Sequence, residues 1–188
     1  MRRWLLPRRR VLRFDSPSPE ATAAAARALA DCLDAGGLIL ALVGPLGAGK
    51  TVFVKGLAEG LGIDPARVAS PTFVIASEYP TRSTATGCLA HVDLFRIASG
   101  AELEATGFLD LLEPGAVLAV EWADRLPGVL PQDRLELRID RSADAARPDA
   151  RVLHGEALGP CARAVLERWQ KALEGLGDPA GPARHSPP

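Results

Sequence analysis

The sequence predicts an α/β fold: a three-layer sandwich around a largely parallel sheet that also holds some antiparallel strands. Two continuously apolar segments, Leu38–Val43 and Val117–Val120, are typical of strands that are buried on both faces. A glycine-rich turn and a strong helix former, Lys50–Leu61, directly follow the first of these segments. By contrast, Leu135–Ile139 alternates strictly between apolar and polar residues, so we expect a half-exposed strand there.

The remaining elements and the domain limits follow from capping residues, turns and composition. We expect one domain over residues 11–174, preceded by a basic, frayed arm at residues 1–10. Residues 175–188 contain three glycines and four prolines, which predicts a disordered tail. The other expected strands are Val11–Phe14, Val68–Tyr79, Leu89–Phe95 and Arg151–His154, and the other expected helices are Ala21–Leu33, Glu102–Thr106 and Leu158–Leu173.

Composition excludes a wholly disordered chain, and charge argues against a general nucleic-acid-binding surface. Hydrophobic residues make up 47% of the 188 residues and charged residues 24%, as in globular proteins. Six arginines precede the first acidic residue, Asp15, and without them 16 basic residues stand against 23 acidic ones. The body of the chain therefore carries a charge of −7, which disfavours autonomous binding to nucleic acid.

No segment indicates secretion, membrane insertion or a structural metal site. The longest apolar runs fall far short of the ~18 residues that cross a bilayer, and the basic arm lacks the apolar core of a signal peptide. The cysteines at positions 32, 88 and 161 form no CxxC pair, and the histidines at 91, 154 and 185 have no zinc-site spacing. We therefore expect a cytoplasmic protein, in a reducing compartment and without a membrane partner.

The segment Gly44–Thr51 matches the phosphate-binding pattern G-x-x-x-x-G-K-[ST], between an expected strand and an expected helix. Its glycines permit tight backbone angles, so successive amide N–H groups can point at phosphate oxygens. The following helix adds its positive N-terminal end. Lys50 is expected to reach the β- and γ-phosphates, and the Thr51 hydroxyl to bind Mg²⁺. The pattern predicts a P-loop NTPase-like fold, with the phosphate-binding residues Gly44, Gly47, Ala48, Gly49, Lys50 and Thr51.

ATP is the expected nucleotide. Common GTPases recognise guanine with an Asn-Lys-x-Asp loop late in the chain, whereas the last lysine here, Lys171, lies between Gln170 and Ala172. Hydrolysis requires carboxylates near Mg²⁺ and near the attacking water. Glu121 ends a buried strand, at the edge where α/β folds bind ligands, so we expect Mg²⁺ coordination rather than an ordinary strand-end carboxylate.

Four further polar or aromatic residues are candidates with two interpretations each. Asp93 is expected to orient the attacking water or a Mg²⁺ shell, and the alternative is a local ion pair with Arg96. His91 is either a packed core residue or part of the site. Thr72 is either a switch hydroxyl for the γ-phosphate or part of a plain turn. Trp122 is either a stacking surface or a cap on the core.

Five motifs occur in an order and spacing that resemble the TsaE (YjeE) family: Leu46–Thr51, Ser70–Phe73, Glu78-Tyr79, His91–Arg96 and Glu121-Trp122. The resemblance implies the bacterial ATPase of the tRNA threonylcarbamoyladenosine pathway, with ATP and Mg²⁺ as cofactors. It also implies TsaB and TsaD as protein partners, with TsaC acting upstream. These partners modify the adenosine next to the anticodon, so contact with tRNA is expected only through the complex, and turnover without partners is expected to be slow.

The resemblance also implies a role for individual residues. Catalytic roles fall on Lys50, Asp93 and Glu121, and Mg²⁺ binding falls on Thr51 and Glu121. Asp93 is also expected to take part in nucleotide binding. The family has an arginine near the nucleotide, late in the chain, and Arg147 is its nearest match here, with Arg151 as a competing match.

Two other functions stay open at this point. A P-loop small-molecule kinase would need an acceptor pocket and an arginine-bearing lid, for which Arg141, Arg147 and Arg151 are candidates within a region that reads as strands. A non-hydrolysing module would bind nucleotide only to present a surface to a partner. The presence of Lys50, Thr51, Asp93 and Glu121 argues against that second alternative.

Overall fold

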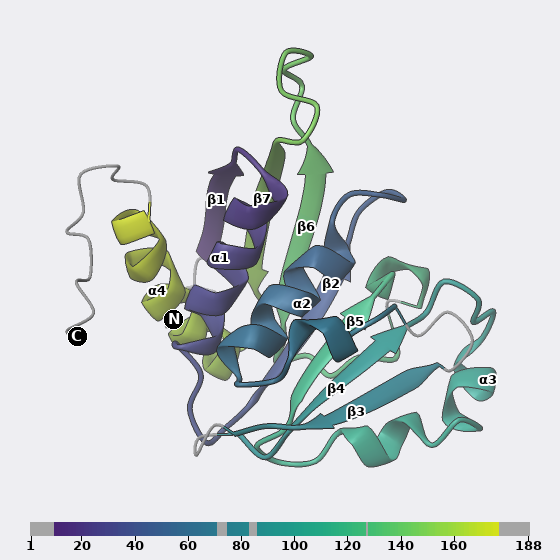
Figure 1. Ribbon diagram of the computed structural model, residues 1–188. Coiled ribbons are helices and arrows are strands. Elements are labelled where there is room, and N and C mark those ends of the chain that lie inside the picture. The colour runs from purple at the N-terminus through teal and green to yellow at the C-terminus, as the bar shows by residue number, and fades with distance from the viewer. Residues whose placement is uncertain (1–9, 71–74, 83–85, 127, 177–188) are drawn as a thin grey trace, which may run out of the picture.

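The computed structural model describes residues 10–70, 75–82, 86–126 and 128–176, and it places them around one seven-stranded mixed sheet (Figure 1). In order across the sheet, the strands are β1 (Arg10–Ser16), β7 (Arg151–Ala157), β6 (Leu135–Arg141), β2 (Leu38–Val43), β5 (Val117–Glu121), β4 (Cys88–Asp93) and β3 (Ala76–Pro80). The four central strands β6, β2, β5 and β4 are parallel, whereas β1, β7 and β3 pair antiparallel with their neighbours. The expected α/β fold with a largely parallel sheet is confirmed.

Three helices cover one face of this sheet: α1 (Pro19–Ala30), α2 (Lys50–Gly60) and α4 (Pro160–Leu176) (Figure 1). The core beneath them is closely packed, with the fully buried rings of Phe53 and Trp169 in an edge-to-face contact at 5.8 Å. The indole Nε1 of Trp169 donates a hydrogen bond of 2.8 Å to the carbonyl oxygen of Ala25 in α1. This packing fixes α2, and with it the segment that precedes α2, against the sheet.

The other face is covered by shorter elements over only part of the sheet. The elements are α3 (Gly100–Glu104), η2 (Phe108–Leu111) and η3 (Ala123–Arg125), and a second core cluster joins them to β4 and β5. On the same face of β1, β7 and β6, the side chains of Arg13, His154 and Arg138 are exposed. The sandwich therefore has three layers around β2, β5 and β4 and two layers at the antiparallel edge.

One expected strand is much shorter than its sequence pattern predicts. The pattern predicts a strand over Val68–Tyr79, but the short helix η1 (Pro65–Arg67) lies just before it and β3 begins only at Ala76. The pairing with β4 ends near this point, because Asp93, the last residue of β4, donates from its amide to the carbonyl oxygen of Ile75. Residues 71–74 between them, which include Thr72, lie outside the described residues.

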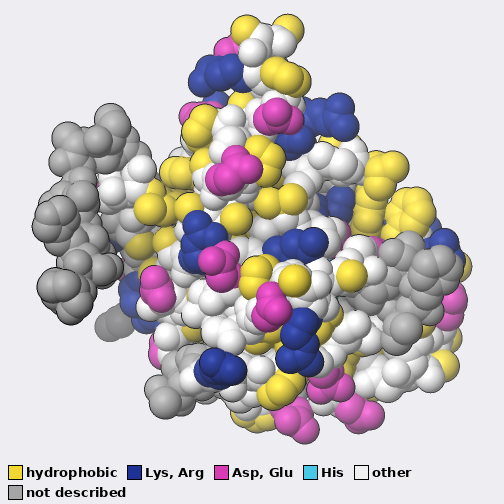
Figure 2. All heavy atoms as spheres, viewed as in Figure 1, with side chains coloured by type: hydrophobic (Ala, Val, Ile, Leu, Met, Phe, Trp, Pro, Cys, Tyr) yellow, Lys and Arg dark blue, Asp and Glu magenta, His cyan; other side chains and the backbone are white. Residues whose placement is uncertain are grey.

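The chain ends, the surface charge and the lengths of the helices were the subjects of the remaining predictions. Most of the arm at 1–10 and of the tail at 175–188 lies outside the described residues, although β1 includes Arg10 and α4 reaches Leu176. Basic and acidic side chains are interspersed over the face that carries α1 and α2 (Figure 2), where Arg27 and Glu59 pair at 2.6 Å. Of the helices that the structure describes, none combines the length and apolar character required to span a membrane.

Candidate functional site

The glycine-rich loop lies at the carboxyl end of β2 and leads directly into α2. Its backbone takes left-handed conformations that favour glycine, with φ of 148° at Gly44, 73° at Gly47 and 105° at Gly49. A Cβ atom on Gly44 would lie 2.2 Å from the carbonyl oxygen of Ile139 in β6, so a larger residue would push the loop off the sheet. The loop therefore makes the tight, glycine-dependent turn that is typical of phosphate-binding loops.

Lys50, the first residue of α2, is almost fully buried beneath this loop, with 4% of its surface exposed. Its ammonium Nζ donates hydrogen bonds to the carbonyl oxygens of Gly44 (2.8 Å) and Pro45 (3.1 Å). The same ammonium lies 3.7 Å from the ring centroid of Trp122, a cation–π contact. Burial lowers the pKa of Lys50 from 10.5, although the nearby carboxylates, Glu121 first among them, favour the charged form.

Thr51 and Glu121 meet across the cleft although they are far apart in the sequence. The hydroxyl Oγ1 of Thr51 donates to Oε1 of Glu121 at 2.8 Å. Glu121 is 3% exposed and ends β5, the parallel neighbour of β2. The same carboxylate oxygen lies 2.9 Å from Nε2 of His91, which is fully buried in β4. A hydroxyl and a carboxylate oxygen thus lie side by side at the base of the loop, a donor set that suits a hard divalent cation.

Asp93 lies beside Glu121 because the two residues are paired in the register of β4 and β5. Its Oδ2 accepts a hydrogen bond of 2.6 Å from the hydroxyl of Ser70, and its Oδ1 accepts one of 2.8 Å from the backbone amide of Phe95. Both carboxylate oxygens are therefore held in place at the edge of the cleft, as a group that orients a water or a metal shell requires.

The arginines of the late strands differ in what they contact. Arg151, at the start of β7, donates from Nε to the carbonyl oxygen of Ala48 (2.9 Å) and from Nη2 to that of Gly47 (3.4 Å). Arg141, at the end of β6, also lies close to the loop, since a Cβ on Gly47 would come within 3.1 Å of its Nη2. The side chain of Arg147 is 63% exposed and pairs with Asp144 at 2.8 Å. The nucleotide role predicted for Arg147 stays a prediction, while Arg151 is the arginine that braces the loop.

Trp122 contributes to the wall of the site through an unusual backbone conformation. It is the one residue other than glycine, among those described, that has a positive φ, at 60°. In that conformation its indole packs on Lys50 on one side and lies 5.0 Å from the ring of Phe95, measured between centroids. Trp122 therefore contacts the site through Lys50 and Phe95 and also packs against the second core cluster, so the two interpretations that the sequence leaves open both stay predictions.

Together these residues enclose a cleft of about 460 Å³, a size within the usual range for small-ligand sites. The structure brings together the predicted residues of the phosphate loop and the two predicted carboxylates. The residues that line the cleft are Leu46, Gly47, Ala48, Gly49, Lys50, Thr51, Val52, Ser70, Asp93, Phe95, Glu121 and Trp122. Gly44 lies at the foot of the loop, where its carbonyl accepts from Lys50.

Three contacts of the site were not predicted from the sequence. They are the bond from Ser70 to Asp93, the bond between His91 and Glu121, and the brace from Arg151 to the loop. Each joins residues that are distant in sequence, and the local patterns around them carry no signal for the pairing. The register of β4 against β5 is what brings His91 and Glu121 to the same end of the sheet.

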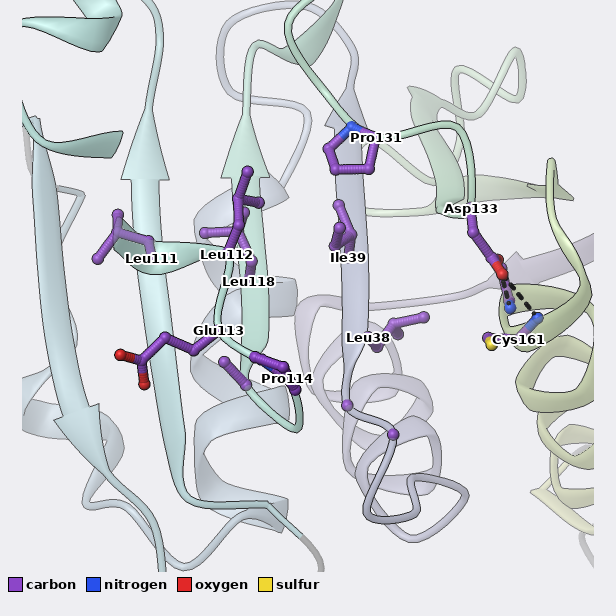
Figure 3. Close-up of a pocket in the computed structure, with 14 residues that line it drawn as sticks. Leu38, Ile39, Leu111, Leu112, Glu113, Pro114, Leu118, Pro131, Asp133 and Cys161 are labelled. Carbon is purple, nitrogen blue, oxygen red and sulfur yellow. Dashed lines mark hydrogen bonds between the residues drawn. The ribbon is translucent and has the colours of Figure 1, made fainter. Parts of the chain in front are cut away.

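A second cleft, of about 280 Å³, lies at the opposite, amino ends of the central strands (Figure 3). Most of its wall is apolar or backbone, including Leu38, Leu111, Pro114 and Pro131. The carboxylate of Asp133 points to the start of α4, where it accepts from the amides of Cys161 and Ala162, at 3.0 Å each. That carboxylate is therefore used to cap a helix.

The sequence matches the family described as "Threonylcarbamoyl adenosine biosynthesis protein TsaE" over residues 16–149, which include the phosphate loop and both carboxylates. The chain belongs to the TsaE family. It is 40% identical to the tRNA threonylcarbamoyladenosine biosynthesis protein TsaE of Streptomyces coelicolor over 146 residues, which cover 78% of this chain and 92% of that protein. Identity to the protein of the same name from Bacillus subtilis is also 40%, over 72% of this chain and 82% of the relative.

The fold is likewise similar to that of a solved relative. The crystal structure of YdiB from Bacillus subtilis superposes with a TM-score of 0.65 at 32% sequence identity, covering 88% of this chain and 98% of that one. The family expected from the five motifs is thereby confirmed. In this TsaE protein four of the five motifs contribute residues to the cleft at the carboxyl ends of β2, β4 and β5, whereas Glu78 and Tyr79 lie in β3, outside its lining.

Proposed function

We propose that this TsaE protein binds and hydrolyses ATP with Mg²⁺, in support of the threonylcarbamoylation of tRNA. The role in tRNA threonylcarbamoyladenosine biosynthesis rests on its relatives, which carry that name. The observation that supports the nucleotide chemistry best is the contact of 2.8 Å between Thr51 and Glu121, which joins the phosphate loop to the carboxylate at the end of β5.

The residues present fit both cofactors. The left-handed glycines of the loop and the start of α2 suit a chain of phosphates, and Lys50 supplies a positive charge beneath them. Thr51 and Glu121 would hold Mg²⁺, which when bound would neutralise charge on the phosphate oxygens. Gly47, Ala48 and Gly49 would contribute backbone amides to the same phosphates, in the lining of the cleft.

The chain's own groups divide the work of binding and hydrolysis. Lys50 would exchange its hydrogen bonds with the carbonyls of Gly44 and Pro45 for contacts with phosphate oxygens. Asp93, fixed by Ser70 and Phe95, would orient the attacking water. Arg151 would keep the loop in place through the carbonyls of Gly47 and Ala48. In this scheme catalysis is mainly positioning and electrostatic stabilisation.

The proposed partners are TsaB and TsaD, with TsaC acting upstream, and tRNA would be reached through that complex. The charge of −7 on the chain without its arginine-rich start supports an indirect role, because such a surface repels the phosphate backbone. P-loop proteins are often slow until a partner completes the site, so we expect slow turnover of the protein alone.

Phosphate release from ATP tests the proposal, measured for the purified protein with Mg²⁺ and then with TsaB and TsaD added. We expect slow release by the protein alone, faster release in the mixture, and no labelled phosphate on a pool of metabolites. If ATP stays intact even in the mixture, the protein is a nucleotide-dependent interaction module instead. If labelled phosphate moves stoichiometrically to a metabolite, the protein is a kinase.

The three arginines that were candidates for a kinase lid do not form one in the described part of the chain. Arg141 and Arg151 belong to β6 and β7, and Arg151 is held by two carbonyls of the phosphate loop. Arg147, which lies in the connection between those strands, pairs with Asp144. The geometry therefore favours hydrolysis over transfer to a small molecule.

A further inference from the structure

His91 differs from the other polar groups near the site because it is fully buried and does not line the cleft. It lies in β4, two residues before Asp93, between Ser77 of β3 and Ala119 of β5 in the strand register. A buried imidazole loses its hydration, and this loss has to be offset by hydrogen bonds within the protein. The bonds that His91 makes therefore indicate what the residue does.

The single hydrogen bond that the described residues provide to this ring goes to Glu121. Nε2 lies 2.9 Å from Oε1 of that carboxylate, whereas Nδ1 has no hydrogen-bond partner within the described part of the chain. An ionised carboxylate can only accept, so Nε2 carries the hydrogen and donates it. The ring is thus oriented toward the carboxylate that is expected to bind the metal.

Glu121 is held at the same oxygen from two sides. Thr51 donates to Oε1 from α2 at 2.8 Å, and His91 donates to it from β4. Thr51 is itself an expected Mg²⁺ ligand, so its contact with Glu121 has to change when a metal is bound. His91 lies outside the lining of the cleft, so a metal bound in the cleft would leave its bond to Glu121 in place.

We infer that His91 is a positioning residue, which fixes the Glu121 carboxylate in the orientation that binds Mg²⁺. This inference rests on the proposed function, because it assigns a role toward the metal of the same site. Outer-shell groups of this kind typically change metal affinity by about 10-fold to 100-fold when they are removed. A residue that only fills space would leave metal affinity unchanged.

Two substitutions separate the hydrogen bond from the packing. His91→Leu keeps a similar volume but has no donor, whereas His91→Gln offers an amide N–H at a similar reach. His154→Leu is the matched control, since His154 is exposed on β7 and belongs to the uncovered face of the sheet. The measurement is the affinity for a non-hydrolysable ATP analogue, titrated with and without Mg²⁺, so that no turnover is needed.

We expect Mg²⁺ to strengthen binding of the analogue to the unchanged protein, and His91→Leu to reduce that enhancement by about 10-fold or more. Affinity without Mg²⁺ is expected to change less than twofold, His91→Gln to recover most of the enhancement, and His154→Leu to match the unchanged protein. An unaltered enhancement in folded His91→Leu would refute the positioning role while leaving the proposed function intact. No Mg²⁺-dependent binding in the unchanged protein would overturn both proposals.

If His91→Leu fails to fold, the imidazole spectrum of the unchanged protein and the His91→Gln variant decide the matter. Long-range ¹H–¹⁵N correlation spectra distinguish the two tautomers of a neutral ring. An Nε2–H tautomer together with retained enhancement in His91→Gln would support the inference. An Nδ1–H tautomer, or loss of the enhancement in a folded His91→Gln variant, would overturn it.

Discussion

Two clefts lie at opposite ends of the central parallel strands, and they differ in what is buried at their walls. The cleft at the carboxyl ends, of about 460 Å³, has Lys50, Asp93 and Glu121 in its lining, each less than 10% exposed. The cleft at the amino ends, of about 280 Å³, has two carboxylates in its lining, the exposed Glu113 and the helix-capping Asp133 (Figure 3). Burying a charged group is unfavourable unless partners compensate for the lost hydration. Several buried charged groups in one cleft are typical of catalytic sites, and only the first of these two clefts has them.

The two clefts should differ most in how a carboxylate-to-amide substitution changes the rate of phosphate release. Glu121→Gln should retain nucleotide binding without Mg²⁺ but lose most of the enhancement of binding by Mg²⁺. It should lower phosphate release in the complex with TsaB and TsaD by about 10²–10³-fold, because one charge that supports Mg²⁺ is lost. The same change at Glu113, in the other cleft, is the control and should leave the rate within about twofold. If Glu121→Gln hydrolyses ATP within about threefold of the unchanged protein, Glu121 is a structural residue, and the Mg²⁺ role moves to Asp93.

A smaller effect is expected when the buried lysine is removed. Lys50→Ala takes away a charged donor to phosphate, and such hydrogen bonds contribute about 1.5–3 kcal/mol, so ATP should bind roughly 10-fold to 100-fold more weakly. Turnover should fall in parallel. Lys55→Ala, on the exposed side of the same helix, is the matched control, and isothermal titration with ATP measures both. Equal affinities of the two variants would place the phosphates away from Lys50.

The burial of Lys50 should be visible in how the affinity for ATP depends on pH. In the free protein, burial lowers the pKa of Lys50 below its ordinary value of 10.5. The negative charges of Glu121, Asp93 and Asp124 raise the pKa and so offset part of this effect. ATP favours the protonated form, so affinity should fall as pH rises through this lowered pKa, earlier than for an ordinary lysine. A Lys50→Arg variant keeps its charge and should bind with a flatter pH profile. If the affinity of the unchanged protein for ATP stays constant up to pH 10, burial does not lower the pKa of Lys50 in the way expected here.

The smallest effects are expected at the second cleft, where stability rather than turnover should respond. Asp133→Ala removes the acceptor for two amides at the start of α4, which should lower stability by about 1 kcal/mol and Tm by about 2–4 °C. ATP affinity should stay the same. Thermal unfolding with and without nucleotide checks both statements, and a loss of affinity would mean that the two clefts are coupled.

The Asp133 carboxylate should also make the stability of the protein depend on pH in the acid range. Burial alone would raise the pKa of Asp133, but the amide hydrogen bonds from Ala162 and Cys161 lower it below 3.8. Its contribution to stability is therefore fully present above that ordinary value and is lost as pH falls through the lowered pKa. In acid, the difference in Tm between the unchanged protein and Asp133→Ala should shrink accordingly.

The sequence predicted those parts of the site that depend on local pattern. The phosphate loop, with Lys50 and Thr51, follows from eight consecutive residues between a strand and a helix, and Glu121 follows from its place at the end of an apolar strand. The partners of these residues could not be predicted, because the contact between His91 and Glu121 depends on the register of two strands. Local pattern determines which residues reach the sheet edge, and topology determines which of them meet.

The strand β6 shows a further limit of pattern. Its strict alternation correctly predicted a half-exposed strand, yet β6 is parallel to β2 and lies within the parallel part of the sheet. The alternation indicates that helices cover one face of β6 and that its other face is open. Leu135, Leu137 and Ile139 are buried on the first face, whereas Arg138 is exposed on the second. The alternation does not indicate strand direction. The order of the strands therefore had to come from the structure.

The position of β1 has a consequence for how the molecule is made. Among the described strands, β1 comes first in sequence but lies at the outer edge of the sheet, where its only ladder partner is β7, with Leu12 opposite Gly155. A ribosome releases β1, which ends at Ser16, long before β7, which begins at Arg151, so β1 waits for the whole segment between them before it can pair. Closing such a long loop is slow, and until then β6 also lacks its outer neighbour. A nascent chain that stalls after β6 would therefore expose two unpaired strand edges, which is where aggregation would begin.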